Sequence, residues 1–379
     1  MFKKLWFLCV VNCALGLDAY VLSGLLPSIA QSIIGSRPGQ VGLGIAIFTL
    51  AYALSTPILG KIFQRIDTSH LLQLAVGVFI VGNILTVCAT TFSVFILGRL
   101  IAGVGAGVFS PLAFATAIKL GGEENKGQAI AIVLAGLSVG TAFGVPFGLW
   151  LSQLYTWKIT ILCIIVLSSV GLLALLLNRS SIPLITTTAS IFNKNIINSK
   201  TVPVLMVTFL TGFTSLGLYS YLGQLLFIQG LMKIDIYAMW LWGIGGCIGA
   251  FSVGKLLDNY ISSQKMTILV LFLLIISFIL LFSGQWHLIV LACFIWGYAG
   301  WSSIVPQQHR LTSISKISHQ NILALNSSLN YLGGALGTAL ASFIAYMQWL
   351  QELPIILILV LGLTLYIHCR HRDMEVDGI

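Results

Sequence analysis

Long apolar stretches recur along the whole of this chain, and they constrain its fold more than any other feature of the sequence. A stretch of about 18 or more apolar residues is long enough to cross the ~30 Å hydrocarbon core of a bilayer as one helix. Only 8% of the residues are charged, whereas a soluble domain carries about 25%. The sequence therefore predicts an all-α membrane protein.

The apolar stretches predict twelve transmembrane helices. The first stretch follows Lys3 and Lys4, as in a signal peptide, but its apolar run is too long and contains Asp18. We therefore expect it to be retained. The expected spans are residues 5–30, 40–60, 70–90, 92–118, 127–152, 157–177, 203–228, 236–256, 266–283, 286–308, 321–346 and 352–369.

The distribution of basic residues predicts the orientation of these helices. With both termini in the cytoplasm, only Arg37, Lys158 and Lys233 lie on the outer side, and the other basic residues outside the spans lie on the inner side. The net charge of +9 is thus spread over short cytoplasmic loops and forms no single basic face. This pattern argues against a nucleic-acid partner.

A polar segment at residues 179–202 divides the expected spans into two groups of six. We expect an N-terminal six-helix bundle at 1–178, a cytoplasmic linker at 179–202, a C-terminal six-helix bundle at 203–369 and a cytoplasmic tail at 370–379. The halves repeat weakly, because GKIFQR at 60–65 aligns with GKLLDN at 254–259, and Gly103 aligns with Gly297 at the same offset of 194. Two pseudo-twofold-related bundles, with a binding site near the midplane between them, are typical of secondary transporters.

The sequence gives no sign of a metal centre or of an ATP site. The seven cysteines lie in or beside apolar spans and form no CxxC pair, so packing is their expected role. Neither HExxH nor a phosphate-binding GxxxxGKS/T motif occurs. We expect no metal, no cofactor and no enzymatic activity.

Asp18 and Arg99 are charged residues deep inside expected spans. A charge near the bilayer middle costs ~3 kcal/mol and normally faces a partner or a cavity. At 1.5 Å per residue, Asp18 lies ~20 Å from the cytoplasmic start of its span and Arg99 ~10 Å from the outer start of its own. Both therefore lie at about the same depth of a ~30 Å core. We expect them to meet or to share one aqueous cavity, as a fixed structural ion pair or as a site that loads and releases a proton.

Glycines form a stripe in the expected fifth span. Gly136, Gly140, Gly144 and Gly148 recur at every fourth residue, so another helix can approach this face closely. Pro146 lies beside the stripe and removes a backbone donor, which favours a kink. The stripe is either a static packing seam or a seam that slides or bends during transport.

Short motifs in these spans resemble those of a known transporter family. Span one reads LDAYVLSGLLPSIAQSI, span four carries RxxxGxGxG from Arg99 to Gly107, and span five carries GVPFG at Gly144–Gly148. On these motifs the chain resembles a major facilitator superfamily transporter, and most the arabinose-efflux-permease-like group of drug/proton antiporter-type exporters. The loop GKLLDN is similar to the family's GxLxDR, whereas Gln64 replaces the usual acid in GKIFQR.

The resemblance covers nearly the whole chain and implies a proton-coupled transporter that exports small organic molecules, such as drugs, sugars or nucleosides, by alternating access. It implies that a proton gradient supplies the energy, that Asp18 and Arg99 couple the proton, and that the protein is a multi-pass monomer of the cell (inner) membrane, surrounded by lipid. Residues expected to act in gating or conformational change are Gly60, Gln64, Arg65, Gly103, Gly107, Gly140, Gly144, Pro146, Gly148, Gly254 and Asp258.

The expected substrate cavity combines aromatic faces with a few polar tips, which is the usual lining of a small-molecule site. Each residue is also compatible with simple packing, and the two asparagines, one turn apart, suit interhelical hydrogen bonds as well as substrate contacts. An uptake facilitator or proton symporter, and in another class a non-transporting receptor or an enzyme, stay open as alternatives. The candidate cavity residues are Tyr52, Tyr219, Tyr221, Gln224, Trp296, Trp301, Asn326 and Asn330.

Overall fold

A computed structural model describes residues 2–33, 38–59, 67–122, 126–183, 197–231, 234–314 and 319–371. Almost all of these residues are helical, and ten of the helices they form are long and apolar enough to cross a membrane. The chain divides into two compact units, Met1–Ala189 and Ser190–Ile379, which are called unit 1 and unit 2 below. The expectation of an all-α membrane protein is confirmed.

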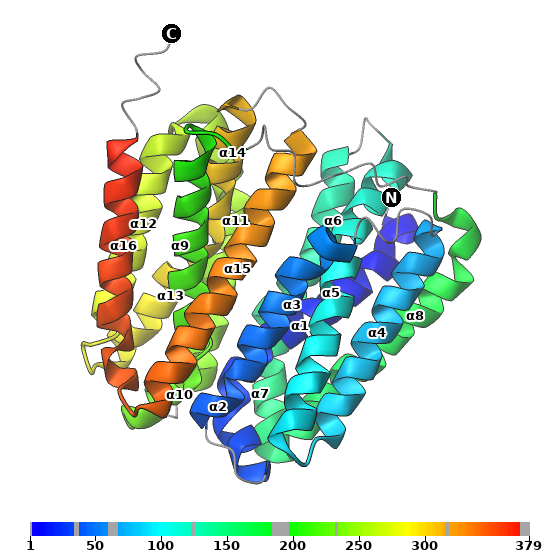
Figure 1. The fold of residues 1–379 in the computed structure, drawn as a ribbon, viewed down its shortest axis with the longest axis horizontal. Coiled ribbons are helices and arrows are strands. Elements are labelled where there is room, and N and C mark those ends of the chain that lie inside the picture. The colour runs from blue at the N-terminus through cyan, green and yellow to red at the C-terminus, as the bar shows by residue number, and fades with distance from the viewer. Residues whose placement is uncertain are drawn as a thin grey trace. The chain divides into compact units, whose positions relative to one another are not determined.

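Unit 1 is a bundle of long helices, drawn from blue to green in Figure 1. Its longest helices are interrupted or capped by specific residues: the Asp67 side chain accepts a hydrogen bond from the Ser69 amide at the start of α4, and Gly122 ends α5 with a φ of 74°. Its elements are α1 (Phe2–Ser32), α2 (Pro38–Val41), α3 (Leu43–Leu59), α4 (Thr68–Cys88), α5 (Phe92–Gly121), α6 (Lys126–Val139), the π-helix η3 (Gly140–Gly144), α7 (Val145–Leu154), α8 (Trp157–Leu177) and the 3-10 turn η4 (Arg179–Ser181).

Unit 2 is a second helical bundle, drawn from green to red. Its elements are α9 (Thr201–Tyr219), α10 (Leu222–Ile228), α11 (Asp235–Asn259), α12 (Ser263–Leu280), α13 (Trp286–Ser302), α14 (Ile304–Ile314), α15 (His319–Tyr346), the 3-10 turn η7 (Leu350–Glu352) and α16 (Leu353–Arg370).

The expected spans agree with these helices in position, although the count by length and composition differs. Ten spans fall on the ten long apolar helices. The second falls on α3, which has 17 residues, and the eleventh on α15, which has 28 residues but a more polar sequence. The twelve-span expectation is therefore consistent with the described helices.

Three expected spans are interrupted well inside their length, and two of the breaks have an evident physical reason. Span five contains the π-turn of η3, and in span seven the first helix, α9, ends at Tyr219 before the short helix α10. In span ten, α13 ends at Ser302, and α14 begins two residues before Pro306. A proline fits the first turn of a helix, because the amide hydrogen it lacks would be unpaired there. In span five the glycines of η3 tolerate a local widening of the helix.

Glycines let α1 lie directly against the fifth span. A Cβ atom at Gly136 or Gly140 would collide with the backbone carbonyl of Cys9 or Cys13 on α1. A Cβ at Gly148 would lie 2.7 Å from the Thr160 side chain of α8. Small residues allow such backbone contact between membrane helices. The glycine stripe of the sequence is thus a surface of close helix approach.

Unit 2 repeats this packing with other residues. A Cβ at Gly333 or Gly337 of α15 would collide with the carbonyl of Phe209 or Phe213 on α9, and these two helices run beside each other in Figure 1. A second correspondence links α5 and α13: Gly103 faces the Phe48 carbonyl, and Gly297 faces the Trp242 carbonyl. Both members of this second contact are shifted by 194 residues, which matches the offset of the sequence repeat.

Candidate functional site

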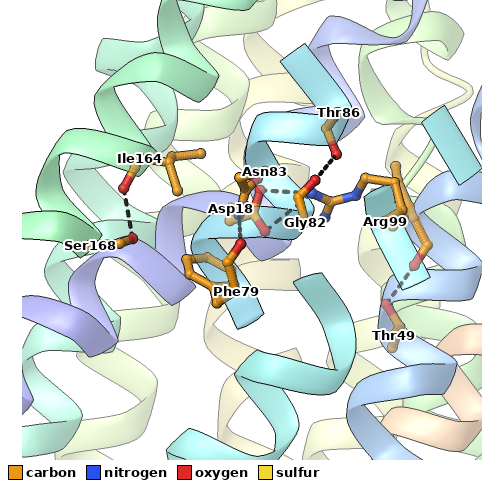
Figure 2. Close-up of polar contacts among 10 residues, drawn as sticks. Asp18, Thr49, Phe79, Gly82, Asn83, Thr86, Arg99, Ile164 and Ser168 are labelled. Carbon is orange, nitrogen blue, oxygen red and sulfur yellow. Dashed lines mark hydrogen bonds and ion pairs between the residues drawn. The ribbon is translucent and has the colours of Figure 1, made fainter. Parts of the chain in front are cut away.

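Asp18 of α1 and Arg99 of α5 form a buried ion pair in unit 1 (Figure 2). A single guanidinium nitrogen, Nη1, donates to both carboxylate oxygens, at 2.9 Å to Oδ1 and 3.1 Å to Oδ2. The exposed fractions of the two residues are 0% and 1%. The depth argument from the sequence left open whether these residues touch, and the structure brings them into direct contact.

Arg99 has a second stabilising neighbour that sequence reasoning missed. The guanidinium carbon lies 4.4 Å from the centre of the Phe48 ring on α3, within the range of a cation–π contact. Gly44, one turn earlier on α3, leaves room for the arginine stem, because a Cβ there would lie 3.2 Å from Arg99 Cγ. Arg99 Nε has no hydrogen-bond partner among the described residues. The guanidinium is therefore held by one acid and one aromatic ring.

Polar side chains from α3 and α4 are drawn with the pair in Figure 2. Two of them are hydroxyls that bond to their own helices: Thr49 donates to the Ile45 carbonyl and Thr86 to the Gly82 carbonyl, both at 2.8 Å. Asn83, which is fully buried, donates its Nδ2 to the Phe79 carbonyl at 3.1 Å. Its Oδ1 has no partner among the described residues. The interior of unit 1 thus contains spare hydrogen-bonding capacity.

The pair is compatible with the two roles that the sequence left open, a fixed structural ion pair and a site that loads and releases a proton. In either role the two charges depend on each other, because removing one member of a buried ion pair costs about 3–5 kcal/mol.

Three of the predicted cavity residues gather in an aromatic cluster of unit 2. Trp242 lies at its centre, with ring centroids 4.0 Å from Tyr219, 6.2 Å from Trp296 and 6.0 Å from Trp301. Trp296 is fully buried, and its Nε1–H donates to the Ser215 hydroxyl at 2.9 Å. Sequence reasoning missed Trp242, although the repeat pairs it with Phe48 of unit 1 at the offset of 194.

The remaining predicted cavity residues lie elsewhere in their units. The Tyr221 hydroxyl donates to Ser342 at 2.9 Å, and Asn326 Oδ1 accepts from Thr208 at 2.7 Å. The backbone carbonyl of Asn330 lies where a Cβ at Gly212 would collide. These contacts join α9 or its C-terminal end to α15, so the interhelical role that the sequence left open for the asparagines is observed for Asn326.

The two further cavity candidates, Tyr52 and Gln224, lie on different helices of different units. Tyr52 of α3 is half-buried, and its carbonyl lies where a Cβ at Gly107 would collide. Gln224 of α10 is half-buried, and its Oε1 is buried without a partner among the described residues.

The residues predicted to act in gating are only partly described. Gly103 and Gly107 lie against α3, Gly140 and Gly144 bound the π-helix η3, and Pro146 and Gly148 belong to α7. A Cβ at Gly254 of α11 would meet no atom of the described residues within 4 Å. Gly60, Gln64 and Arg65 lie outside the described residues, as does the side chain of Asp258.

The two units place different chemistry between corresponding spans. The Arg99–Asp18 pair joins the fourth span to the first, and the Trp296–Ser215 hydrogen bond joins the tenth span to the seventh. The partners are 81 residues apart in both contacts, but the second contact is shifted from the first by 197 residues and not by the 194 of the sequence repeat. The two contacts therefore join corresponding spans, one through charged and one through neutral groups, at positions that are not equivalent in the repeat.

Comparison with known proteins identifies the family. The family model described as Major Facilitator Superfamily matches residues 8–342. Among its relatives, the chain is 27% identical to the uncharacterized MFS-type transporter YbcL of Bacillus subtilis (strain 168), over 96% of this chain and 95% of that protein. It is 22% identical to the inner membrane transport protein YdhP of Escherichia coli (strain K12), over 86% of this chain and 84% of that protein.

Solved structures share the fold at low sequence identity. The nucleoside transporter NupG has a TM-score of 0.80 at 12% identity, over 98% of this chain and 99% of that chain. A D-xylose-proton symporter has a TM-score of 0.75 at 13% identity, over 97% of both chains.

The fold and these similarities define an integral membrane transporter rather than an enzyme. The chain belongs to the Major Facilitator Superfamily, as its motifs indicated.

Proposed function

We propose that this chain is a proton-coupled secondary transporter that exports small organic molecules by alternating access. The observation that carries the proposal is the buried contact between Asp18 and Arg99. Asp18 is the one acid placed deep in an apolar span of the sequence, and intramembrane acids of transporters often serve as proton relays.

The pair supplies two states with different electrostatics. With Asp18 ionised, Arg99 is neutralised at 2.9 Å and the contact ties α5 to α1. With Asp18 protonated, the guanidinium keeps its contact with the Phe48 ring of α3 but loses its counter-charge. Proton uptake therefore shifts the balance of attraction on α5 from α1 toward α3, and each balance favours its own helix arrangement.

The packing around Asp18 offers a route from protonation to helix movement. Gly16, two residues before Asp18, lies against the Leu137 carbonyl and would place a Cβ 3.1 Å from the Thr141 hydroxyl of η3. A π-turn inside a helix is often found at functional sites. A movement of α1 at Asp18 would therefore move the π-helix η3 of the fifth span, which packs directly against it.

The energy available suits concentrative export. One proton moving inward through ~100 mV releases ~2.3 kcal/mol, to which a pH gradient adds. The span-five glycine motif, which resembles that of exporters, favours export over uptake. The protein would work in the inner membrane with both termini in the cytoplasm, as a monomer, and the relative YdhP bears the name of an inner membrane transport protein.

The substrate class is set by what the spans lack. Apart from Asp18 and Arg99, the deep parts of the spans supply aromatic rings, amides and hydroxyls, which suit neutral or cationic amphiphiles, sugars or nucleosides better than polyanions. The alternative is an uptake facilitator or proton symporter. The similarity in fold to a D-xylose-proton symporter shows that the same fold also serves transport of this kind.

Vesicles of both orientations test the proposal. Purified protein is reconstituted with a pH-sensitive dye inside, and a panel of drugs, sugars and nucleosides is added under an imposed proton gradient. In inverted vesicles with an acidic lumen, we expect a substrate of the panel to enter the lumen while protons leave it. Movement of substrate and proton in the same direction would establish the symporter alternative, and substrate movement without any dye response would contradict proton coupling.

A further inference from the structure

One end of unit 2 gathers basic side chains at the tips of three helices. The start of α12, the C-terminal part of α14 and the end of α16 meet there (Figure 1). The sequences of these three helices contain no Asp or Glu. The basic-residue rule expects this end to face the cytoplasm. The basic residues of these helix ends are Lys265, His309, Arg310, His368 and Arg370.

A hydrogen-bond network holds the three helix ends together. The His368 Nε2–H donates to the Gln264 carbonyl at 3.1 Å, which joins α16 to α12. The Arg310 Nη1 approaches His368 Nδ1 at 3.5 Å, and its Nη2 donates to the His371 carbonyl at 3.3 Å. Both contacts fit a neutral imidazole, in which Nε2 carries the hydrogen donated to the Gln264 carbonyl and Nδ1 can accept from the Arg310 guanidinium. His368 and Arg310 are both buried.

This network brings together the backbones that carry two exposed cations. Lys265 directly follows Gln264, and Arg370 lies two residues after His368. The hydrogen bond between Gln264 and His368 therefore holds these two helix ends together. Arg310, which is buried, adds a positive charge to the same network. An anion at these helix ends would be attracted by two exposed cations and by the charge of Arg310.

Each exposed cation ends an exposed apolar stripe. On α12 the stripe follows Lys265 at steps of four, seven and eleven residues, and on α16 it precedes Arg370 at the same steps. Residues at these steps share one face of a helix. The two helices pack against each other, so the stripes offer neighbouring apolar surfaces under the cations. The stripes are Leu269, Phe272 and Ile276 on α12 and Leu359, Leu363 and Tyr366 on α16.

We propose that this end of unit 2 is a binding site for an anionic phospholipid of the cytoplasmic leaflet. The phosphate group would lie between Lys265 and Arg370, and the acyl chains would lie along the two apolar stripes. Basic clusters at the cytoplasmic ends of transmembrane helices bind anionic lipid headgroups through this combination of charge and apolar contact. The site is independent of the proposed direction of transport.

Native mass spectrometry of the full chain in detergent tests the site. The protein is titrated with phosphatidylglycerol or with phosphatidylcholine of the same acyl chains, and retained lipid is counted. We expect preferential retention of phosphatidylglycerol. Each basic residue near the membrane surface strengthens the attraction to anionic lipid. The double variant Lys265→Gln with Arg370→Gln should therefore weaken the binding of phosphatidylglycerol about 30-fold. The matched control is Arg179→Gln with Lys200→Gln, which removes two other exposed cations expected on the same side and should leave retention unchanged.

Three outcomes would overturn the proposal. Equal loss in the control variant would show that net charge, rather than this site, retains the lipid. Equal occupancy by glycerol phosphate, which has the headgroup chemistry without acyl chains, would assign the site to a soluble anion. Unchanged retention of phosphatidylglycerol by Lys265→Gln with Arg370→Gln would show that the lipid is held elsewhere on the chain.

Discussion

Two different partners stabilise the charge of Arg99 inside the membrane, an acid and an aromatic ring. Asp18 neutralises its charge at 2.9 Å, and the Phe48 ring lies 4.4 Å from the guanidinium carbon. A desolvated cation–π contact contributes about 2 kcal/mol, whereas losing one member of a buried ion pair costs about 3–5 kcal/mol. The ring thus adds to the stability of the buried guanidinium beyond its pairing with Asp18.

Removal of the guanidinium should change the pH dependence of transport. In Arg99→Ala the buried carboxylate loses its counter-charge, and leaving one member of a buried ion pair without its partner costs about 3–5 kcal/mol. Under the proposed function, transport should weaken and its pH profile should differ from that of the parent. Flux in proteoliposomes across a pH series measures this. An unchanged pH profile would show that Arg99 does not act on Asp18.

Removal of the aromatic ring should also change the pH profile. In Phe48→Leu the guanidinium keeps Asp18 as its one strong partner among the described residues, so under the proposed function transport should depend differently on pH than in the parent. The matched control is Phe109→Leu, which shortens a fully buried ring of α5 and should lower stability without moving the pH optimum. A shift of equal size in both variants would remove Phe48 from the mechanism.

The sequence predicted that Asp18 and Arg99 lie at one depth, but it left their contact open and missed the aromatic neighbour, and the reason is geometric. Depth in the membrane follows from residue counts at 1.5 Å each, which placed Asp18 and Arg99 at one level. Lateral contacts depend on the rotation and tilt of each helix, which counting does not give. Phe48 and Trp242 were therefore missed, although the offset of 194 that relates the halves also relates these two residues.

At the scale of elements, the spans were predictable and their interruptions were not. Apolar length alone located the helices, because a bilayer demands about 20 residues per span. The π-turn at Gly140–Gly144 depends on how α1 packs against it, and the sequence offered only a choice between a static and a moving seam. Pro306 is compatible with the break before α14, but it could not predict the break, because prolines are also tolerated inside membrane helices.

Two glycine substitutions in unit 1 separate packing from helix propensity. Gly140→Ala places a methyl group against the Cys13 carbonyl, a backbone atom that cannot rotate away, and overpacking of this kind costs about 1–3 kcal/mol. Gly77→Ala meets nothing within 4 Å among the described residues and should gain up to about 1 kcal/mol from helix propensity. Thermal unfolding in detergent should show a lower midpoint for the first variant and an equal or higher one for the second. Equal midpoints would contradict the close contact of α1 with η3.

At the scale of the whole molecule, corresponding spans of the two units are joined by different chemistry. Arg99 with Asp18 links the fourth span to the first, and Trp296 with Ser215 links the tenth to the seventh, at a shift of 197 residues where the repeat has 194. One carboxylate deep in the spans leads us to expect one proton per transport cycle under the proposed function. Membership of the family was predictable from short motifs, whereas the substrate was not, because aromatic and amide side chains serve packing and recognition alike.

The central claim is that Asp18 carries the proton, and Asp18→Asn tests it most directly. Asparagine keeps a carbonyl oxygen that can accept from Arg99, so the fold should survive, but it cannot load and release a proton. The control is Asp67→Asn, which alters an acid at the start of α4 and keeps a good helix cap.

The measurement is substrate accumulation in proteoliposomes after a pH jump, with exchange of labelled substrate at equal pH as the measure of intact binding. The account predicts that Asp18→Asn loses accumulation completely and retains exchange, while Asp67→Asn behaves as the parent. Accumulation by Asp18→Asn at the parent's level would contradict the account and leave Asp18 a structural residue.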